Sequence, residues 1–270
     1  MKPLVIFDMD GVIVNSEPHH IAACERIVRR ISGGRIGAKE AHTVGISTVE
    51  LYRRALEMCG AEGDPAALAA EHFSTTLGEI RRAIPNPEPE LLRLMDALER
   101  RGVRMAVATS SPGSFVEGVL TLYGIMDRFE TVVTGSDAAR LKPAPDVYLL
   151  ALSRCGVPAA DAAAIEDSRI GVEAALAAGL YCFGFVNPGS GKQDLSRADR
   201  RIHSLLEVLE PDEPQPADPE NADTQTEPKT GAQKRSPFRQ DGLPCICALS
   251  GSGRNGKRPV TAAQSCWPRA

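Results

Sequence analysis

Two carboxylates, Asp8 and Asp10, directly follow a short apolar run near the start of the chain, in the sequence PLVIFDMDGV at 3–12. A short run rich in Val and Ile predicts a strand buried on both faces, and Gly11 allows the backbone to turn after it. Open α/β sheets bind ligands at the carboxyl ends of such strands, and neighbouring carboxylates repel each other unless a cation or shared proton intervenes. An aspartate turn is the structural alternative, but further polar elements after later strands favour a catalytic site.

The later polar elements are Thr109, Lys142 and the acidic pair Glu166–Asp167. Thr109 ends the apolar run VRMAVA, Lys142 stands before two prolines in LKPAP, and the acidic pair follows AAAI. Alone, each has a structural explanation: a helix cap, a surface lysine and an acidic helix N-terminus. Their occurrence together indicates one site at the carboxyl edge of a sheet.

The four stretches FDMDGV, VATSS, LKPAPDVY and IEDSRIGVEAALAAG resemble, in order and spacing, the four motifs of the haloacid dehalogenase-like hydrolases. That family comprises aspartyl-phosphate phosphatases and phosphomutases, and the resemblance extends over about residues 3–209. The pattern is most similar to β-phosphoglucomutase and to the small sugar-phosphate phosphatases. The resemblance implies a mobile helical cap and Mg²⁺-dependent phosphoryl transfer.

Asp8 is expected to be the nucleophile, because an aspartyl-phosphate divides one very slow hydrolysis into two easier steps. Asp10 is placed to protonate the leaving oxygen and then to deprotonate the attacking water. That double role requires a carboxyl group whose pKa differs from that of Asp8. Mg²⁺ would relieve the repulsion between the carboxylates and shield the phosphate from the anionic nucleophile.

The remaining metal ligand is expected to be Asp167, since it follows the AAAI strand directly, while Glu166 would bind directly or through water. The resemblance implies that Asp10 contributes its main-chain carbonyl. The expected metal ligands are therefore Asp8, Asp10, Glu166 and Asp167.

The phosphoryl group needs hydrogen-bond donors and a cation near its oxygens. Thr109 can donate its hydroxyl, with Ser110 and Ser111 as secondary donors, and a stiff turn with two prolines would hold the Lys142 ammonium nearby. His20 matches a histidine in the linker of the mutase and is a further candidate for substrate binding, with a polar hinge residue as the alternative.

The composition is that of an ordinary globular protein, with 270 residues, 43% hydrophobic and 24% charged. A net charge of −4 gives no general attraction to nucleic acid or an anionic membrane, and no apolar stretch approaches the ~18 residues that span a bilayer. The amino terminus lacks a signal-like apolar segment, and Cys24, Cys59, Cys155 and Cys182 are scattered as in proteins of a reducing compartment. We therefore expect a cytoplasmic monomer whose partner is a small phosphorylated metabolite, without nucleic acid or membrane.

Alternating helical and strand patterns predict an α/β fold with a doubly wound parallel sheet. Residues 1–15 and 86–210 would form this core, and residues 16–85, which read as helices without strands, an inserted helical cap. Beyond Glu210 the chain is rich in proline and charge, so residues 211–270 are expected to be a disordered tail.

Local signals place the cap helices and the end of the core. The first helix places Ile21, Cys24, Val28 and Ile31 at helical spacing. The next would start at a capping box, Ser47 to Glu50, with an apolar side made of Val49, Tyr52, Leu56 and Cys59. Asp64-Pro65 predicts the N-terminus of a helix that extends to about Ala83. The segment SLLEVLE at 204–210 predicts a last helix.

Two patterns in the tail are interpreted as chance. The sequence GSGRNGK at 251–257 matches a GxGxxG pattern, but no strand and helix surround it. Cys245 and Cys247 lack a second pair at zinc-site spacing.

Three alternatives to a phosphatase share this fold or scaffold. A phosphomutase uses the same chemistry, but Thr48 stands where the mutase has an arginine. A 2-haloacid dehalogenase does not need Asp10, and a non-catalytic binding protein would not need the acidic and lysine residues that are present. Asn15 replaces an aspartate typical of the lineage and leaves Asp8 and Asp10 intact. The sequence therefore predicts Mg²⁺-dependent hydrolysis of a small phosphorylated metabolite, a sugar phosphate.

Overall fold

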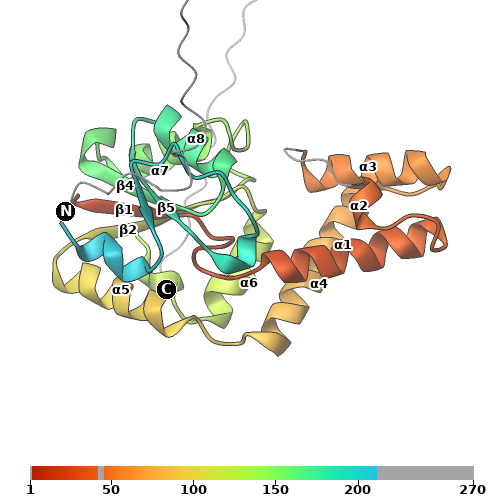
Figure 1. The fold of residues 1–270 in the computed structure, drawn as a ribbon, viewed down its shortest axis with the longest axis horizontal. Helices are drawn as coiled ribbons and strands as arrows, with labels where there is room; N and C mark the ends of the chain where they lie inside the picture. Colours follow the sequence, from red (N-terminus) through yellow and green to blue (C-terminus); the bar gives the residue numbers. More distant parts are fainter. Residues whose placement is uncertain (1, 42–45, 212–270) are drawn as a thin grey trace, which may run out of the picture. The chain divides into compact units, whose positions relative to one another are not determined.

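The computed structural model describes residues 2–41 and 46–211, which belong to one compact unit (Figure 1). Six parallel strands form one sheet in the order β3-β2-β1-β4-β5-β6. The strands are β1 (Leu4–Phe7), β2 (Arg104–Ala108), β3 (Thr131–Val133), β4 (Ala162–Glu166), β5 (Tyr181–Phe185) and β6 (Arg200–Ile202). Since the chain crosses from β1 outward in both directions, the predicted doubly wound α/β fold is confirmed.

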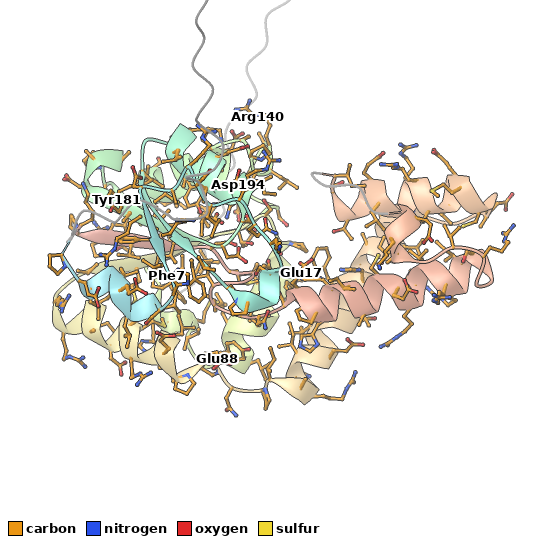
Figure 2. All side chains as sticks on the ribbon, in the orientation of Figure 1. Phe7, Glu17, Glu88, Arg140, Tyr181 and Asp194 are labelled. Carbon is orange, nitrogen blue, oxygen red and sulfur yellow. The ribbon has the colours of Figure 1, made fainter. Side chains whose placement is uncertain are left out.

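The side chains of β1 alternate between two hydrophobic clusters, one on each face of the sheet. Val5 and Phe7 pack with α5 (Pro89–Arg100), α6 (Gly113–Leu122) and the 3₁₀ segment η4 (Leu205–Leu209). Leu4 and Ile6 pack with α7 (Asp146–Cys155) and α8 (Arg169–Ala177). Figure 2 shows Phe7 inside the core, where it has no exposed surface. Burial of β1 on both faces explains why its sequence is a continuous apolar run.

In the described part of the segment between β1 and α5, the structure has four helices: α1 (Glu17–Ser32), α2 (Ala38–Ala41), α3 (Thr48–Cys59) and α4 (Pro65–Ala83). Glu17, labelled in Figure 2, marks the start of α1. Cys24, Val28 and Tyr52 belong to a separate hydrophobic cluster of these helices. Within the described part of the chain this insert has no strand, as predicted, while the boundaries 1–15, 16–85 and 86–210 stay predictions.

The cap residues of two helices follow the sequence signals to different degrees. Asp64 accepts a hydrogen bond from the Ala66 N–H at 2.9 Å, as expected of an N-cap. Ser47 accepts one from the Glu50 N–H at 3.2 Å, but the Glu50 carboxylate pairs with Arg53. Only half of the predicted capping box forms, because an arginine one turn along competes for the glutamate.

Three local predictions were wrong. Ile21 and Val49 are 57% and 45% exposed, because the buried stripe of α1 runs through His20 and Cys24 and Val49 faces outward at the start of α3. The segment predicted as a last helix is the 3₁₀ segment η4, and strand β6, which carries two arginines, gave no apolar signal.

The remaining short elements are 3₁₀ segments η1 (Met126–Arg128), η2 (Ala159–Asp161) and η3 (Pro188–Ser190). Cys24, Cys59, Cys155 and Cys182 are buried free thiols, as the sequence indicated. Among the described residues no helix is long and apolar enough to cross a membrane. The predicted tail, with its GxGxxG pattern and its cysteine pair, lies outside the described residues except for Pro211.

Candidate active site

The turn after β1 brings Asp8 and Asp10 to the carboxyl edge of the sheet. The Asp8 N–H donates to the Ile165 carbonyl at 3.0 Å, which continues the pairing of β1 with β4. Gly11 then adopts φ = 84°, and a β-carbon on it would lie 1.7 Å from Oδ2 of Asp167. Gly11 is therefore required both by the left-handed backbone and by the close approach of this carboxylate.

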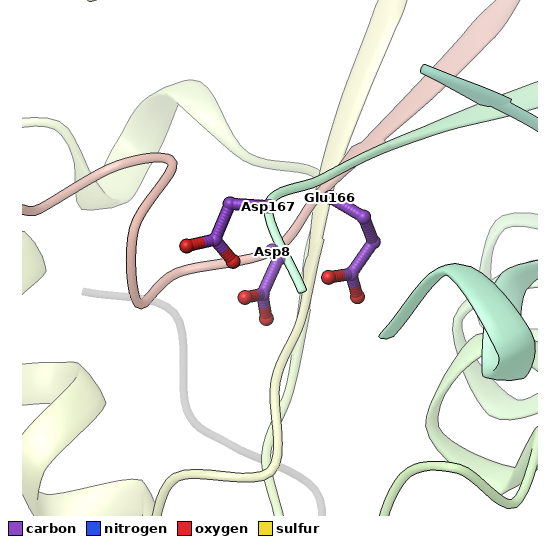
Figure 3. A group of neighbouring side chains, drawn as sticks. All are labelled: Asp8, Glu166 and Asp167. Carbon is purple, nitrogen blue, oxygen red and sulfur yellow. The ribbon is translucent and has the colours of Figure 1, made fainter. Parts of the chain in front are cut away.

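Three carboxylates meet at this edge: Asp8, Glu166 and Asp167 offer oxygens that all lie within 4.8 Å of one another. All three residues are buried. Figure 3 shows Asp8 between the other two, with the Glu166 and Asp167 side chains directed to opposite sides. Consecutive residues of an extended chain alternate in this way, so one acidic pair supplies two different surroundings.

Lys142 is the cation of this group. Its ammonium donates to Oδ1 of Asp8 at 2.7 Å, to Oε1 of Glu166 at 2.6 Å and to the Ala108 carbonyl at 2.9 Å. An ammonium has three hydrogens, and all three are used. Burial works to lower the pKa of Lys142, but the two carboxylates outweigh it and raise the pKa, so the ammonium stays charged.

Glu166 is occupied by partners on the side away from Asp167. Oε1 accepts from the Tyr148 hydroxyl as well as from Lys142, and Oε2 lies 3.5 Å from the Ser168 hydroxyl. A β-carbon on Gly171 would lie 1.8 Å from Oε2. These contacts fix the Glu166 carboxylate and through it the position of the Lys142 ammonium.

Asp167 is held by the segment that follows β5. The Ser190 hydroxyl donates to Oδ2 of Asp167, and the Asn187 side-chain amide donates to Ser190 Oγ at 3.0 Å and to the Gly11 carbonyl at 2.8 Å. Burial raises the pKa of Asp167 to about 7, against the lowering effect of the Ser190 hydrogen bond. The surroundings of Asp167 therefore supply too little positive charge to offset the cost of burying its ionised carboxylate.

Asp8 and Asp10 have opposite electrostatic surroundings. Burial first, and the Glu166 charge second, raise the pKa of Asp8 well above its usual value, despite Lys142. Burial would also raise the pKa of Asp10, but hydrogen bonds with His20 and from two serine hydroxyls outweigh it and lower the pKa. These hydroxyls belong to Ser16, 2.5 Å from Oδ1, and Ser111, 2.6 Å from Oδ2.

The three hydroxyl residues after β2 have different contacts. Thr109 is 1% exposed, and its hydroxyl oxygen accepts the Ser111 N–H at 3.0 Å. The Ser110 hydroxyl oxygen accepts the Lys142 N–H at 3.2 Å, which ties the lysine turn to the end of β2. The Ser111 hydroxyl donates to Asp10, whereas in the structure described the hydroxyls of Thr109 and Ser110 act only as acceptors.

His20, in the first turn of α1, lies beside Asp10 with 3.4 Å between Nε2 and Oδ1. Its other ring nitrogen, Nδ1, lies 2.8 Å from Nε2 of His72 in α4. The structure therefore places His20 against the carboxylate of Asp10, although the sequence suggested a contact with substrate.

The structure brings together all the residues expected from the sequence and adds others that sequence reasoning missed. The added residues are Ser16, His72, Tyr148, Asn187 and Ser190. Only Tyr148 had a local signal, because a tyrosine on the buried face of a helix needs a partner for its hydroxyl. The others contact the site through pairings that only the folded chain creates.

The three carboxylates fit a divalent cation. Among the residues described, Lys142 is the only cationic side chain that pairs with any of these carboxylates, and it pairs with Asp8 and Glu166. The pKa values of Asp8 and Asp167 are both raised. Oxygen ligands with a net negative charge are what Mg²⁺ prefers. The negative charge that Lys142 does not balance lies between Asp8 and Asp167. Of these two carboxylates, the Lys142 ammonium contacts only Asp8.

Comparison with known proteins places the chain in a family. The sequence profile of the haloacid dehalogenase-like hydrolases matches residues 5–185. The protein CbbY of Cereibacter sphaeroides is 30% identical over 222 residues, which cover 77% of this chain and 94% of that protein. Fructose-1-phosphate phosphatase YqaB of Escherichia coli is 33% identical over 183 residues, 65% of this chain and 92% of that protein.

A solved structure agrees with these sequence similarities. A CbbY variant from Rhodobacter sphaeroides in complex with xylulose-(1,5)bisphosphate superposes with a TM-score of 0.67 at 25% identity. The match covers 77% of this chain and 96% of that one. The chain therefore belongs to the haloacid dehalogenase-like hydrolases, in the subgroup similar to sugar-phosphate phosphatases, and is an enzyme of the phosphoric monoester hydrolase class.

Proposed function

We propose that this protein hydrolyses a small sugar phosphate in two steps, through a phosphoryl group carried by Asp8. The observation that supports this most is the geometry at the end of β1, where Asp8 lies 2.7 Å from the Lys142 ammonium and beside the carboxylates of Glu166 and Asp167. Asp10, two residues on, is held separately by the hydroxyls of Ser16 and Ser111, as an acid/base group beside a nucleophile requires. Lys142 and a bound Mg²⁺ would together supply the positive charge that holds the nucleophile ionised.

In the first step an oxygen of Asp8 attacks phosphorus, the bond from phosphorus to the leaving oxygen breaks, and Asp10 gives that oxygen its proton. In the second step Asp10 takes a proton from water, the water oxygen attacks phosphorus, and the bond to Asp8 breaks. Inorganic phosphate leaves with Asp8 free and Asp10 protonated again, as at the start of the first step. Since Asp10 is an ionised carboxylate in the free site, it would take up that proton from solvent as substrate binds, because the negative charge of the substrate raises its pKa.

Mg²⁺ would be held by the carboxylates of Asp8 and Asp167 with the main-chain carbonyl of Asp10. When bound, the ion neutralises charge on the phosphate oxygens. Glu166 would act by fixing the Lys142 ammonium, because its carboxylate is already engaged by Tyr148 and Lys142. Thr109 and Lys142 would bind the phosphoryl oxygens.

A sugar phosphate is proposed because relatives that are matched over more than nine-tenths of their length have such names or ligands. One is named fructose-1-phosphate phosphatase, and a CbbY structure contains xylulose-(1,5)bisphosphate. No residue of the insert identifies the sugar, so the class of substrate is as far as this proposal goes.

The test is phosphate release over a panel of sugar phosphates, with and without Mg²⁺ and with a chelator. Asp8→Asn should reduce turnover by more than about 10⁴-fold, since it removes the nucleophile. Asp127→Asn is the matched control, because Asp127 is an exposed acid in η1. A folded Asp8→Asn protein that keeps substantial activity would rule out the covalent route, and activity unaffected by chelator would rule out the metal.

The phosphomutase is the competing outcome of the same assay. A mutase must exclude water and return the phosphoryl group to a bound intermediate, which calls for a firm grip on a second phosphate. Thr48, the first residue of α3, has one hydroxyl and no charge. We expect free phosphate as the main product from hexose phosphates, and little conversion of β-glucose 1-phosphate to glucose 6-phosphate with a bisphosphate activator present. Efficient isomerisation without phosphate release would favour the mutase.

A further inference from the structure

The last helix of the insert, α4, packs both inside the insert and against the core of the enzyme. Its first half joins the hydrophobic cluster of the insert, where Leu68 and Ala69 pack with residues that include Tyr52. Its second half joins the core cluster through apolar side chains at helical spacing, the last of them at the C-cap: Phe73, Leu77, Ile80 and Ile84. One continuous helix therefore carries the insert on the core.

α4 meets the core helix α6 at a glycine, Gly118 (Figure 1). A β-carbon on Gly118 would lie 2.4 Å from Cδ2 and 3.2 Å from Cδ1 of Leu77, so the end of the leucine occupies the space that a side chain would need. Glycine in the interior of a helix is unfavourable relative to alanine, and the helical backbone of α6 would accept alanine here. The close approach of Leu77 is therefore the physical reason for glycine at this position.

α1 is bound to α4 along its length. The hydrophobic cluster of the insert includes residues of both helices, and two ion pairs join them: Arg26 with Glu79 and Arg30 with Glu71. In the first turn of α1, the ring of His20 stacks on His72 of α4 with 5.0 Å between centroids. A displacement of α4 relative to the core would therefore carry His20 with it.

The His20 ring lies between the two helices that meet at Gly118. Its centroid is 5.6 Å from that of Phe73 in α4 and 5.2 Å from that of Phe115 in α6. Phe73 and Phe115 lie about one turn before Leu77 and Gly118, so the aromatic contacts and the leucine–glycine contact belong to the same interface. The place of the His20 ring relative to the core thus depends on how closely α4 approaches α6.

We propose that Leu77 and Gly118 are positioning residues, whose contact sets how closely the insert approaches the core and so holds Nε2 of His20 3.4 Å from Oδ1 of Asp10. Neither residue touches Asp10. They act through the separation of α4 from α6, which the glycine allows to be small. The expected effect on turnover rests on the proposed function, whereas the approach of the two helices is a property of the free protein.

Nuclear Overhauser contacts between ring protons measure this approach in the full chain. Wild type should show contacts from His20 to both Phe73 and Phe115. Gly118→Val adds two methyl groups beyond a β-carbon that already meets Leu77, so it should move α4 away from α6. The contact between His20 and Phe115 should then be lost, while the contact between His20 and Phe73 should persist because both residues move with the insert.

Leu77→Ala is the compensating change, because it removes the methyl groups that the new valine would meet. The double variant Leu77→Ala/Gly118→Val should therefore recover the contact between His20 and Phe115. Thr121→Val is the matched control, since it places valine at an exposed position of the same helix, and it should give the wild-type spectrum. Melting temperatures of the variants distinguish lost structure from lost positioning.

The kinetic test compares two leaving groups. With an active sugar phosphate, Gly118→Val should lower kcat about tenfold and change KM less, since a misplacement of about 1 Å can cost about 10²-fold in rate. Turnover of 4-nitrophenyl phosphate should fall much less, because nitrophenolate leaves without a proton and does not need the acid role of Asp10. A general loss of structure would lower both activities alike, and the double variant should recover most of the loss.

The proposal would be overturned if folded Gly118→Val kept the contact between His20 and Phe115, or if Leu77→Ala failed to restore it. Should Gly118→Val not fold, Gly118→Ala takes its place, with a smaller loss of the same contact and the same reversal by Leu77→Ala. Failure to find a phosphate-monoester substrate would refute the proposed function and leave the spectra to decide the role of Leu77 and Gly118.

Discussion

At the scale of single residues, the site combines one buried ammonium with three buried carboxylates. Lys142 satisfies Asp8 and Glu166 directly, and Asp167 depends on a hydroxyl from Ser190. Removing one partner from such a group leaves a buried charge without compensation. The free energy lost in this way is much larger than the net stability that the intact group contributes. The free enzyme should therefore be sensitive to the charge of Asp167 and to the contacts that hold it.

The stability of the metal-free protein should fall as Asp167 ionises. Burial raises the pKa of Asp167 from 3.8 to about 7, so its contribution is fully present below pH 4 and is lost as pH rises through 7. Asp167→Asn cannot ionise and should become more stable than wild type over that range, by up to roughly 4 kcal/mol. Denaturant unfolding from pH 4 to 8 in chelator measures the difference.

Mg²⁺ provides the control for this prediction. Millimolar Mg²⁺ should stabilise wild type at pH 8 and have little effect on Asp167→Asn, because the ion offsets a charge that the variant lacks. An equal pH dependence in both proteins would mean that Asp167 titrates normally.

Ser190→Ala should weaken Mg²⁺ binding about tenfold, because partners that orient a metal ligand typically contribute 10- to 100-fold in affinity. Ser190 both donates to Asp167 and accepts from Asn187, so its loss frees the carboxylate to turn. Titration calorimetry with MgCl₂ alone measures the effect. Ser196→Ala, at an exposed position in the same connection, should bind like wild type, and equal affinities for both variants would exclude the role of Ser190.

At the scale of elements, the short apolar strands and the residues after them could be predicted from the sequence. β1, β2 and β4 are buried on both faces, so hydrophobicity alone located them and placed Asp8, Thr109 and Asp167 at one edge. Strand β6 could not be predicted, because Arg200 is buried through an ion pair with Glu210 and not through apolar character.

The contacts that adjust the site were also beyond the sequence. Ser16, Ser111 and Ser190 donate to aspartates, but a serine in a loop has many possible partners. The pairing of His20 with His72 joins residues 52 positions apart, and their approach depends on how α1 packs against α4. Such pairings follow from tertiary packing, which local patterns do not encode.

The start of α8 packs directly against the end of β4, which makes Gly171 sensitive to substitution. Alanine in a helix is favoured over glycine by about 1 kcal/mol. In Gly171→Ala the new β-carbon would lie 1.8 Å from the Glu166 carboxylate, so we expect a net loss of about 2 kcal/mol and reduced phosphatase activity. Denaturant unfolding and phosphate release measure these effects.

Gly78→Ala is the matched control for this substitution. A β-carbon on Gly78, within α4, meets only an Arg82 side-chain nitrogen at 3.9 Å. This variant should gain up to about 1 kcal/mol and keep full activity. A gain of stability in both glycine variants would show that a β-carbon at position 171 does not clash with the Glu166 carboxylate.

At the scale of the whole molecule, the hydrolase sequence profile ends at residue 185 and the described elements end at η4. CbbY and YqaB are each matched over more than nine-tenths of their length by less than four-fifths of this chain. The acidic and basic segments beyond residue 211 lie outside the residues that the profile matches, and their disorder stays a prediction.

Truncation after Pro211 should leave activity and melting temperature nearly unchanged. Pro211 is kept because its carbonyl accepts a hydrogen bond from Arg200 at 3.3 Å, and Glu210 pairs with the same guanidinium. Thermal unfolding and phosphate release compare the truncated and full chains. A control that ends at Ser204 removes η4 and should lose stability, and a comparable loss after Pro211 would show that the remaining residues pack on the core.

The register of the central strands has a genetic consequence. Phe7 lies opposite Val107 on one side and Ile165 on the other. The residues that follow these three strands therefore emerge at the same level of the sheet edge. Loss of one codon within β4 would shift the downstream chain by about 3.3 Å and turn each side chain to the opposite face. After such a deletion, Asp167 would occupy the place in the structure that Glu166 holds in the wild type, although no other residue of the sequence has changed. In-frame deletions should therefore be tolerated least across 162–167 and far better in the turn at 33–37.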